Sequence, residues 1–193
     1  MGAYPMSISS RGRGFTIGLI GAVTVAAMLL VAIAPAQARL VAPRSKCPGQ
    51  QKISAPEPQQ EKTMRCLINF ARNQAGAGSV SDESSLEKAA GRKAGDVVRC
   101  GFSHTACGRP ADTYAREFGY MSASSWLWGE NLAWGRGNLG SPRNILKAWL
   151  NSPPHRETML NGTFEHVGLG LNRGSFEGHA NAAVWVLELG CHC

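Results

Sequence analysis

The chain has 193 residues, and its 20 Lys and Arg against 13 Asp and Glu give a formal net charge of +7. Hydrophobic residues make up 44% and charged residues 17%, a balance that excludes a disordered chain, a collagen-like repeat and a coiled coil. The basic residues are scattered and form neither a run nor a helical stripe, so we expect no nucleic-acid partner.

The first 38 residues predict a secretory signal peptide. Arg11 and Arg13 precede an uncharged, mostly apolar run over residues 15–34, and Ala36-Gln37-Ala38 has the small-x-small form that signal peptidase accepts. Cleavage before Arg39 would leave a length that suits one domain. The alternative is that the run stays as a membrane anchor, because 20 residues can span a bilayer. Both alternatives place the domain outside the cytoplasm, as a secreted or membrane-anchored extracellular protein.

All six cysteines lie beyond the signal segment. An even number of cysteines in an exported chain predicts disulfides rather than a reduced metal site. Six cysteines allow 15 pairings, and the short separation of Cys100 and Cys107 favours a small closed loop between them. The pairs that we expect are Cys100–Cys107, Cys47–Cys66 and Cys191–Cys193.

Four helices are expected before the last third of the chain. Residues 39–60 are rich in Pro, Gln, Ser and Lys and are predicted to form a linker. Apolar residues at i, i+3, i+4 and i+7 predict an amphipathic helix over 61–74, and a Ser-Ser-Leu-Glu capping box opens a second over 84–97. Proline near the start predicts two more helices, over 110–119 and 141–152, the latter stopped by two further prolines.

The final residues change to the period of strands. Residues 164–171 and 182–189 predict two strands joined by a loop of Asn, Gly and Ser. The second strand is apolar on both faces, so it should be covered on both sides, with Trp149 and Trp185 in the core. Helices followed by such strands predict an α+β fold, a three-layer α-β-α sandwich with a small central antiparallel sheet.

Two histidines and one glutamate are the candidates for chemistry. His104 and His155 lie among turn residues, and Glu130 stands in a Trp-Gly-Glu-Asn-Leu-Ala segment. Two imidazoles and a carboxylate can form a three-ligand divalent-metal site with an open position, although such a trio is also common on ordinary surfaces. Ser103 next to His104 does not indicate a serine protease, because no Gly-x-Ser-x-Gly elbow is present.

Four short motifs occur in a fixed order: Phe-Ser-His ending at His104, Gly-Glu-Asn-Leu-Ala from Gly129, Trp-Leu-Asn-Ser-Pro-Pro-His-Arg from Trp149, and Val-Gly-Leu-Gly from Val167. Together they resemble the signature of the CAP superfamily, also called SCP-like domains, which includes cysteine-rich secretory, antigen-five and class-one pathogenesis-related proteins. The bacterial extracellular branch is the most similar. The likeness covers about residues 61–190 and assigns a CAP domain to residues 61–193.

The resemblance implies a cleft with a His/Glu/Glu/His tetrad, in which His104, Glu130 and His155 match three members. The second glutamate would fall at Ser152, so one negative ligand is absent. The resemblance still implies a site for zinc or another divalent metal at His104, Glu130 and His155. Three further residues are expected in the cleft, Asn131, Ser152 and Arg156.

The resemblance favours a secreted, non-enzymatic binding module whose partner is a cell-envelope component, a lipid or a protein. The alternative is a metal-dependent hydrolase, a protease or an envelope hydrolase, that uses the same cleft to activate a water. A purely structural envelope protein is a third interpretation. Contact with a membrane is expected only if the signal segment is kept as an anchor.

Overall fold

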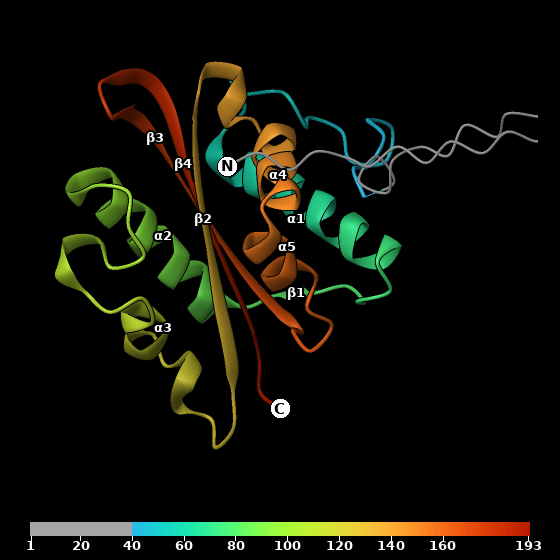
Figure 1. Cartoon of the computed structure of the whole chain (residues 1–193), viewed down its shortest axis with the longest axis vertical. Helices are drawn as coiled ribbons and strands as arrows, with labels where there is room; N and C mark the ends of the chain where they lie inside the picture. Colours follow the sequence, from blue (N-terminus) through green and yellow to red (C-terminus); the bar gives the residue numbers. More distant parts are fainter. Residues whose placement is uncertain (1–39) are drawn as a thin grey trace, which may run out of the picture. The chain divides into compact units, whose positions relative to one another are not determined.

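The computed structural model describes residues 40–193, so the predicted signal peptide and its cleavage site lie outside the described residues. Nine helices and strands of this part of the chain form the framework (Figure 1). In chain order they are α1 (Glu57–Gln74), β1 (Ser81–Asp82), α2 (Ser84–Cys100), α3 (Thr113–Glu117), β2 (Leu127–Arg136), α4 (Pro142–Asn151), α5 (Pro153–Leu160), β3 (His166–Phe176) and β4 (His179–Cys191).

The four strands form one mixed sheet in the order β1-β3-β4-β2. β4 pairs antiparallel with both β2 and β3. The sequence predicts the pair of β3 and β4, but not the strand β2. The two-residue strand β1 pairs parallel with β3, so the sheet is not purely antiparallel. β2 lies at the open edge of the sheet, which leaves one side of this strand available for a site.

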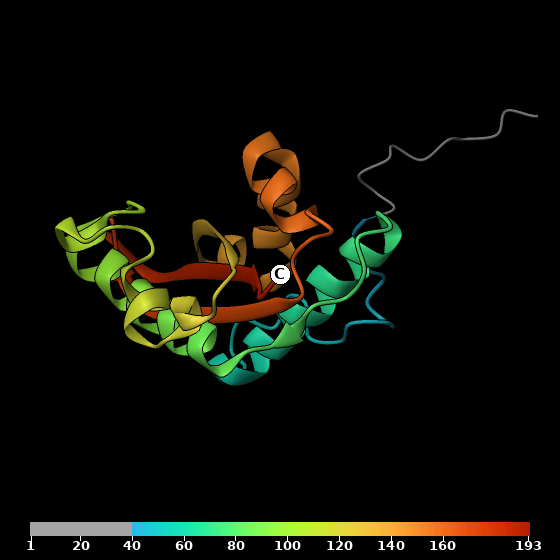
Figure 2. The same ribbon diagram turned by 90° about the horizontal axis from the view of Figure 1, so that it is seen from below.

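Helices cover both faces of the sheet. α2 and α3 lie on one side, and α1, α4 and α5 lie on the other (Figure 1). The turned view in Figure 2 shows the strands between α2, in green, and the orange helices α4 and α5. Trp149 and Trp185 are 1% and 0% exposed, which confirms their predicted place in the core. The α+β sandwich expected from the sequence is therefore present.

Two glycines in β3 allow α2 to lie directly on the sheet. A Cβ on Gly168 would stand 2.1 Å from the backbone carbon of Leu86, and one on Gly170 would stand 2.3 Å from that of Ala90. Real Cβ atoms do not approach a backbone so closely, so any larger residue forces the helix away. This contact sets the distance between α2 and the sheet, and it therefore also sets the position of the side chains that α2 directs at the sheet.

The segment predicted as a linker is packed against the domain. Leu40, Ala42 and Cys47 are buried, and Gln50 donates a hydrogen bond to the carbonyl oxygen of Ala42 over 3.1 Å. α1 begins at Glu57 rather than at residue 61. The segment packs on the domain because the disulfide from Cys47 ties it to α1 and because the Gln50 side chain is buried. A helical periodicity reveals neither effect.

Other boundaries also differ from the prediction. Glu83, rather than Ser84, caps α2, because its carboxylate accepts the Leu86 N–H over 2.9 Å. The two prolines that follow α4 also begin the next helix. They occupy the first turn of α5, where the missing N–H of proline has no cost because that N–H would have no partner within the helix. On α4, Leu146 and Leu150 are buried, whereas Ala148 is exposed.

The structure contains three disulfides, and they join the same cysteine pairs that the sequence analysis expects: Cys47–Cys66, Cys100–Cys107 and Cys191–Cys193. Cys100 is the last residue of α2, so its bond to Cys107 closes the loop that follows this helix. Among residues 40–193, no helix combines the length and the hydrophobicity that crossing a bilayer requires.

Candidate functional site

The loop after α2 carries His104 and is held from two sides. The Cys100–Cys107 disulfide closes the loop, and the ammonium group of Lys93 donates a hydrogen bond to the carbonyl oxygen of His104 over 2.6 Å. Lys93 is 1% exposed and stands on the face of α2 that lies on the sheet. The backbone of His104 is therefore fixed, while its side chain remains 52% exposed.

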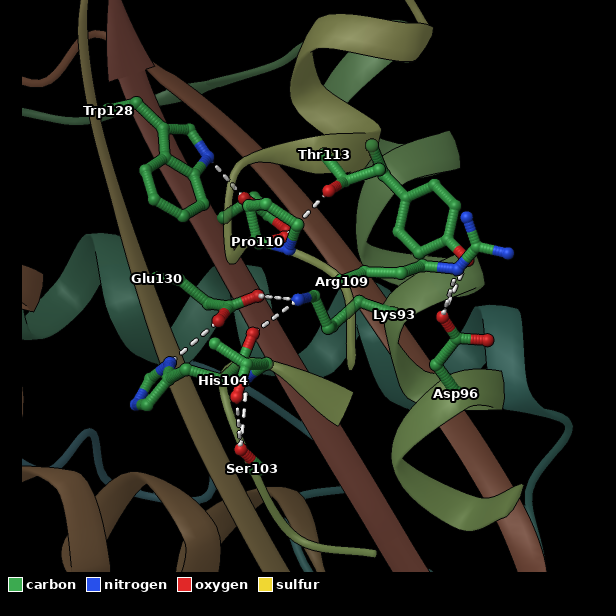
Figure 3. Close-up of polar contacts among 12 residues, drawn as sticks. Lys93, Asp96, Ser103, His104, Arg109, Pro110, Thr113, Trp128 and Glu130 are labelled. Atoms are coloured by element: carbon green, nitrogen blue, oxygen red, sulfur yellow. Dashed lines mark hydrogen bonds and ion pairs between the residues drawn. The ribbon is translucent and has the colours of Figure 1, made fainter. Parts of the chain in front are cut away.

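Glu130 fixes the ring of His104. Nδ1 of His104 and Oε1 of Glu130 are 2.6 Å apart, and the Glu130 side chain is only 2% exposed (Figure 3). A carboxylate can only accept a hydrogen bond, so Nδ1 carries the proton and Nε2 of the neutral ring is a free acceptor. The pair thus presents a partly exposed imidazole in one tautomer and one orientation.

A second carboxyl group lies beside Glu130. Glu188 stands opposite Glu130 in the β2–β4 pairing, is 1% exposed, and accepts a hydrogen bond from the indole N–H of Trp128. Burial, and next the proximity of Glu130, raise the pKa of Glu188 well above its ordinary value. The raised pKa favours the protonated form of Glu188, whose O–H would serve Oε2 of Glu130, a buried oxygen that lacks another hydrogen-bond partner.

Lys93 balances the charge that remains on Glu130. Its Nζ lies 3.9 Å from Oε2 of Glu130, and both side chains are excluded from solvent (Figure 3). A buried carboxylate needs such a partner, because removing an isolated charge from water is very costly. Whenever Glu188 is protonated, the buried layer beneath His104 contains the Glu130 carboxylate and the Lys93 ammonium as its two opposite charges.

His155 reaches the same strand from the opposite face of the sheet. Neighbouring residues of a strand point to opposite faces, so Glu130 faces α2 while Asn131 faces α5. Asn131 is 1% exposed and donates to the carbonyl oxygen of His155 over 2.8 Å. Nδ1 of His155 lies 2.7 Å from the Ser152 hydroxyl. Burial, and then the nearby His104, lower the pKa of His155, so its ring is neutral at pH 7.

The edge strand β2 therefore positions both histidines, one from each side of the sheet. We use the name histidine–glutamate cluster for His104, Glu130, His155, Lys93 and Glu188. Ser152 and Asn131 orient His155 within it. Arg156, expected in the same cleft, lines a hollow of about 450 Å³ along α5 with Glu157 and Leu160.

β2, Lys93 and Glu188 are parts of the site that the sequence patterns do not predict. The Trp-Gly-Glu-Asn-Leu-Ala segment shows no clean alternation and contains glycine, so it does not predict a strand. Lys93 occupies a position on the apolar stripe of α2, and Glu188 interrupts the apolar strand β4. A charged residue at a position that faces the core needs a partner, and this signal could have found both residues.

The side chains around Glu130 do not form a set of ligands for a divalent metal. The described residues contain no group of three or more His, Cys, Asp and Glu side chains placed to hold a metal ion. One oxygen of Glu130 is bonded to His104, and the other faces the Lys93 ammonium, which would repel a cation. Glu130 therefore does not fit as a metal ligand here, and a zinc centre at His104, Glu130 and His155 stays a prediction.

Comparison with known proteins identifies the family. The model of the CAP family, described as the cysteine-rich secretory protein family, matches residues 66–189, which is more than half of the chain. The chain belongs to the CAP family. The matched residues contain the whole histidine–glutamate cluster, whereas the packed segment before α1 lies outside them.

One relative of this CAP protein is a bacterial protein. It is 32% identical over 114 residues to the uncharacterized protein YkwD of Bacillus subtilis (strain 168), and the match covers 57% of this chain and 41% of that protein. The chain thus spans about two fifths of the length of this relative.

Two solved structures share the fold. One is an extracellular protein of Bacillus anthracis strain Ames that contains an SCP domain, with TM-score 0.57, 19% identity and coverage of 72% of this chain and 42% of that one. The other is an outer surface protein of Borrelia burgdorferi, with TM-score 0.57, 22% identity and coverage of 70% and 95%. At these identities the likeness supports the fold alone.

Proposed function

We propose that this CAP protein is an extracellular, non-enzymatic binding module that holds a cell-envelope component at the histidine–glutamate cluster. The observation that carries the proposal is the Glu130–His104 pair, in which a buried carboxylate holds an exposed imidazole in one orientation. The signal-like N-terminus and the extracellular and outer-surface relatives support a location outside the cell.

The cluster offers hydrogen-bonding groups to a ligand. The tautomer fixed by Glu130 leaves Nε2 of His104 as an acceptor. The Ser152 hydroxyl can donate or accept, so Nε2 of the neutral His155 can adapt to the ligand. The buried carboxylate is already balanced by Lys93. These properties suit a ligand with hydroxyl and amide groups, and we therefore favour a cell-wall glycan or its attached peptide.

The contacts around His104 and Glu130 support binding rather than hydrolysis. Ser103 and Thr105, the hydroxyl residues that flank His104, bond to each other over 3.0 Å. Glu130 is occupied on one oxygen by His104 and faces Lys93 with the other. If a divalent metal binds, the exposed imidazole of His104 and the half-buried imidazole of His155 would hold it, and its chemistry would be activation of a water. Binding of the envelope component does not require that metal.

The proposal is tested by co-sedimentation of the purified, disulfide-bonded protein with insoluble peptidoglycan. We expect saturable binding that His104→Ala and His155→Ala each weaken at least about tenfold. His179→Ala is the matched control, because this ring stacks on Trp134 with centroids 5.8 Å apart and takes no part in the cluster. Binding that neither cluster variant changes would contradict the proposal. Release of soluble fragments that stops in Glu130→Gln would instead support the hydrolase.

A further inference from the structure

A second polar site lies on α2, on the side toward α3. A hollow of about 270 Å³ opens between three arginines, Arg92, Arg99 and Arg109, with Asp96 and Tyr114 in its wall. We call it the arginine hollow. None of these residues belongs to the histidine–glutamate cluster, and the function proposed above does not use them. The volume exceeds the share of one water molecule, about 30 Å³, several times over, so a small solute fits.

The buried carboxylate of Asp96 and the aromatic ring of Tyr114 hold the arginine side chains in place. The Asp96 side chain is 4% exposed and forms an ion pair with Arg99. It forms a second ion pair with Arg109, whose Nε lies 3.4 Å from the carboxylate (Figure 3). The Tyr114 hydroxyl donates to the same carboxylate over 2.6 Å. The guanidinium carbons of Arg92 and Arg109 lie 5.9 and 5.7 Å from the centre of the Tyr114 ring. The site is therefore ordered before any ligand arrives.

The contacts of Asp96 do not use up the arginine donors. Each guanidinium has five N–H groups, and Asp96 engages one nitrogen of Arg99 and Nε of Arg109. The side chains of Arg99 and Arg109 remain 65% and 48% exposed. Three guanidinium charges against one carboxylate leave a formal excess of two positive charges in the wall. The hollow thus combines free donors with an unbalanced charge.

Two glycines form the floor of the hollow. Gly91 and Gly95 lie one turn apart in the middle of α2, and a Cβ on either would meet no atom within 4 Å. Close packing therefore does not require glycine at these positions, although glycine inside a helix costs about 1 kcal/mol relative to alanine. Their absent side chains leave the space between the arginines open, and backbone at the floor is accessible to a ligand.

We propose that the arginine hollow binds the phosphoryl group of a phosphate monoester. Arginine matches phosphate oxygens with paired N–H donors, and the formal excess of two charges matches the dianion of a monoester. A free phosphorylated metabolite and a monoester lipid headgroup present the same group. The test is therefore built so that its arms distinguish these two sources.

The protein with its disulfides formed is titrated with glycerol 3-phosphate, with glycerol as the uncharged control, while amide chemical shifts are recorded. We expect saturable shifts at Gly91 and Gly95 with the phosphate ester and none with glycerol. Arg92→Gln and Arg109→Gln should each weaken binding about tenfold or more. Arg136→Gln removes the same charge from an exposed position at the end of β2 and should change the affinity less than twofold.

Gly95→Leu separates a built site from general surface charge. It fills the hollow without altering any charge, and it favours the helix, so the variant should fold and lose binding at least about tenfold. Wild-type affinity in Gly95→Leu, or an equal loss in Arg136→Gln, would overturn the proposal. Flotation with vesicles of phosphatidylcholine and phosphatidic acid identifies the source. Arg109-dependent flotation assigns a lipid headgroup, and glycerol 3-phosphate binding without flotation assigns a free ester.

Discussion

Lys93→Met removes the ammonium group that faces Glu130 and leaves a buried carboxylate without its cation. Nζ and Oε2 are 3.9 Å apart, and the two side chains are 1% and 2% exposed. At an effective dielectric constant of about 20, two unit charges at this distance attract each other by about 4 kcal/mol. Breaking one partner of a buried pair typically costs about 3–5 kcal/mol. We therefore expect unfolding free energy to fall by about 3–5 kcal/mol.

The assay is urea unfolding at pH 7.5 with the disulfides intact, followed by tryptophan fluorescence. The variants are Lys93→Met, Glu130→Gln and the double variant, so that the cycle isolates the pair. Because the double variant removes both charges, its loss should be smaller than the sum of the single losses by at least about 2 kcal/mol. Lys88→Met removes an exposed lysine of the same helix and should change stability by less than about 0.5 kcal/mol.

Two results would refute this reasoning. The first is a loss below about 1 kcal/mol in Lys93→Met, which would mean that water reaches the pair. The second is additivity of the single losses, which would mean that Lys93 stabilises the fold through its bond to the His104 carbonyl oxygen and not through Glu130.

Three further predictions concern Glu188, the contact between α2 and the sheet, and His155. The raised pKa of Glu188 means that the folded protein keeps a proton that the unfolded chain releases at about pH 4.3, so the free energy of unfolding falls as the pH rises above that value. Glu188→Gln should flatten this slope in unfolding curves recorded from about pH 4 to 8. Glu117→Gln, at an exposed position, is the control and should leave the slope unchanged. Gly168→Ala should cost about 1–3 kcal/mol or more in urea unfolding, because it pushes α2 off the sheet, while Gly174→Ala, with open space at its Cβ, should be nearly neutral. Because the pKa of His155 is lowered in the folded protein, the unfolded chain binds a proton first as the pH falls below about 6.5, and the free energy of unfolding decreases. His155→Gln should remove this loss of stability in the same assay.

Much of the fold follows from local patterns in the sequence. The i, i+3, i+4 spacing along α1 and α2 and the doubly apolar strand β4 predict a sheet between helices, with Trp149 and Trp185 buried. Those patterns work because burial of apolar faces dominates the stability of the sandwich. The segment before α1 behaves differently, since a disulfide and the buried Gln50, rather than an apolar stripe, hold it on the domain.

The site was predictable only in part. The order of the four motifs identifies His104, Glu130 and His155 as candidates. No spacing rule predicts that β2 forms the edge of the sheet, or that Glu130 and Asn131 point to opposite faces of it. Glu188 and Lys93 depend on cross-strand and helix–sheet contacts between residues far apart in the chain. Such partners follow from the tertiary structure, and a lone charge at a core position is their only local sign.

The central claim is that the histidine–glutamate cluster binds an envelope component through two imidazoles and without a metal ion. The most direct measurement is a side-chain ¹⁵N spectrum of histidine-labelled protein, titrated with soluble peptidoglycan fragments in the presence of EDTA. The account predicts that the Nε2 signals of His104 and His155 shift saturably while those of His179 stay in place. Fragment binding that EDTA abolishes and zinc restores, with the same two signals moved by zinc alone, would contradict it.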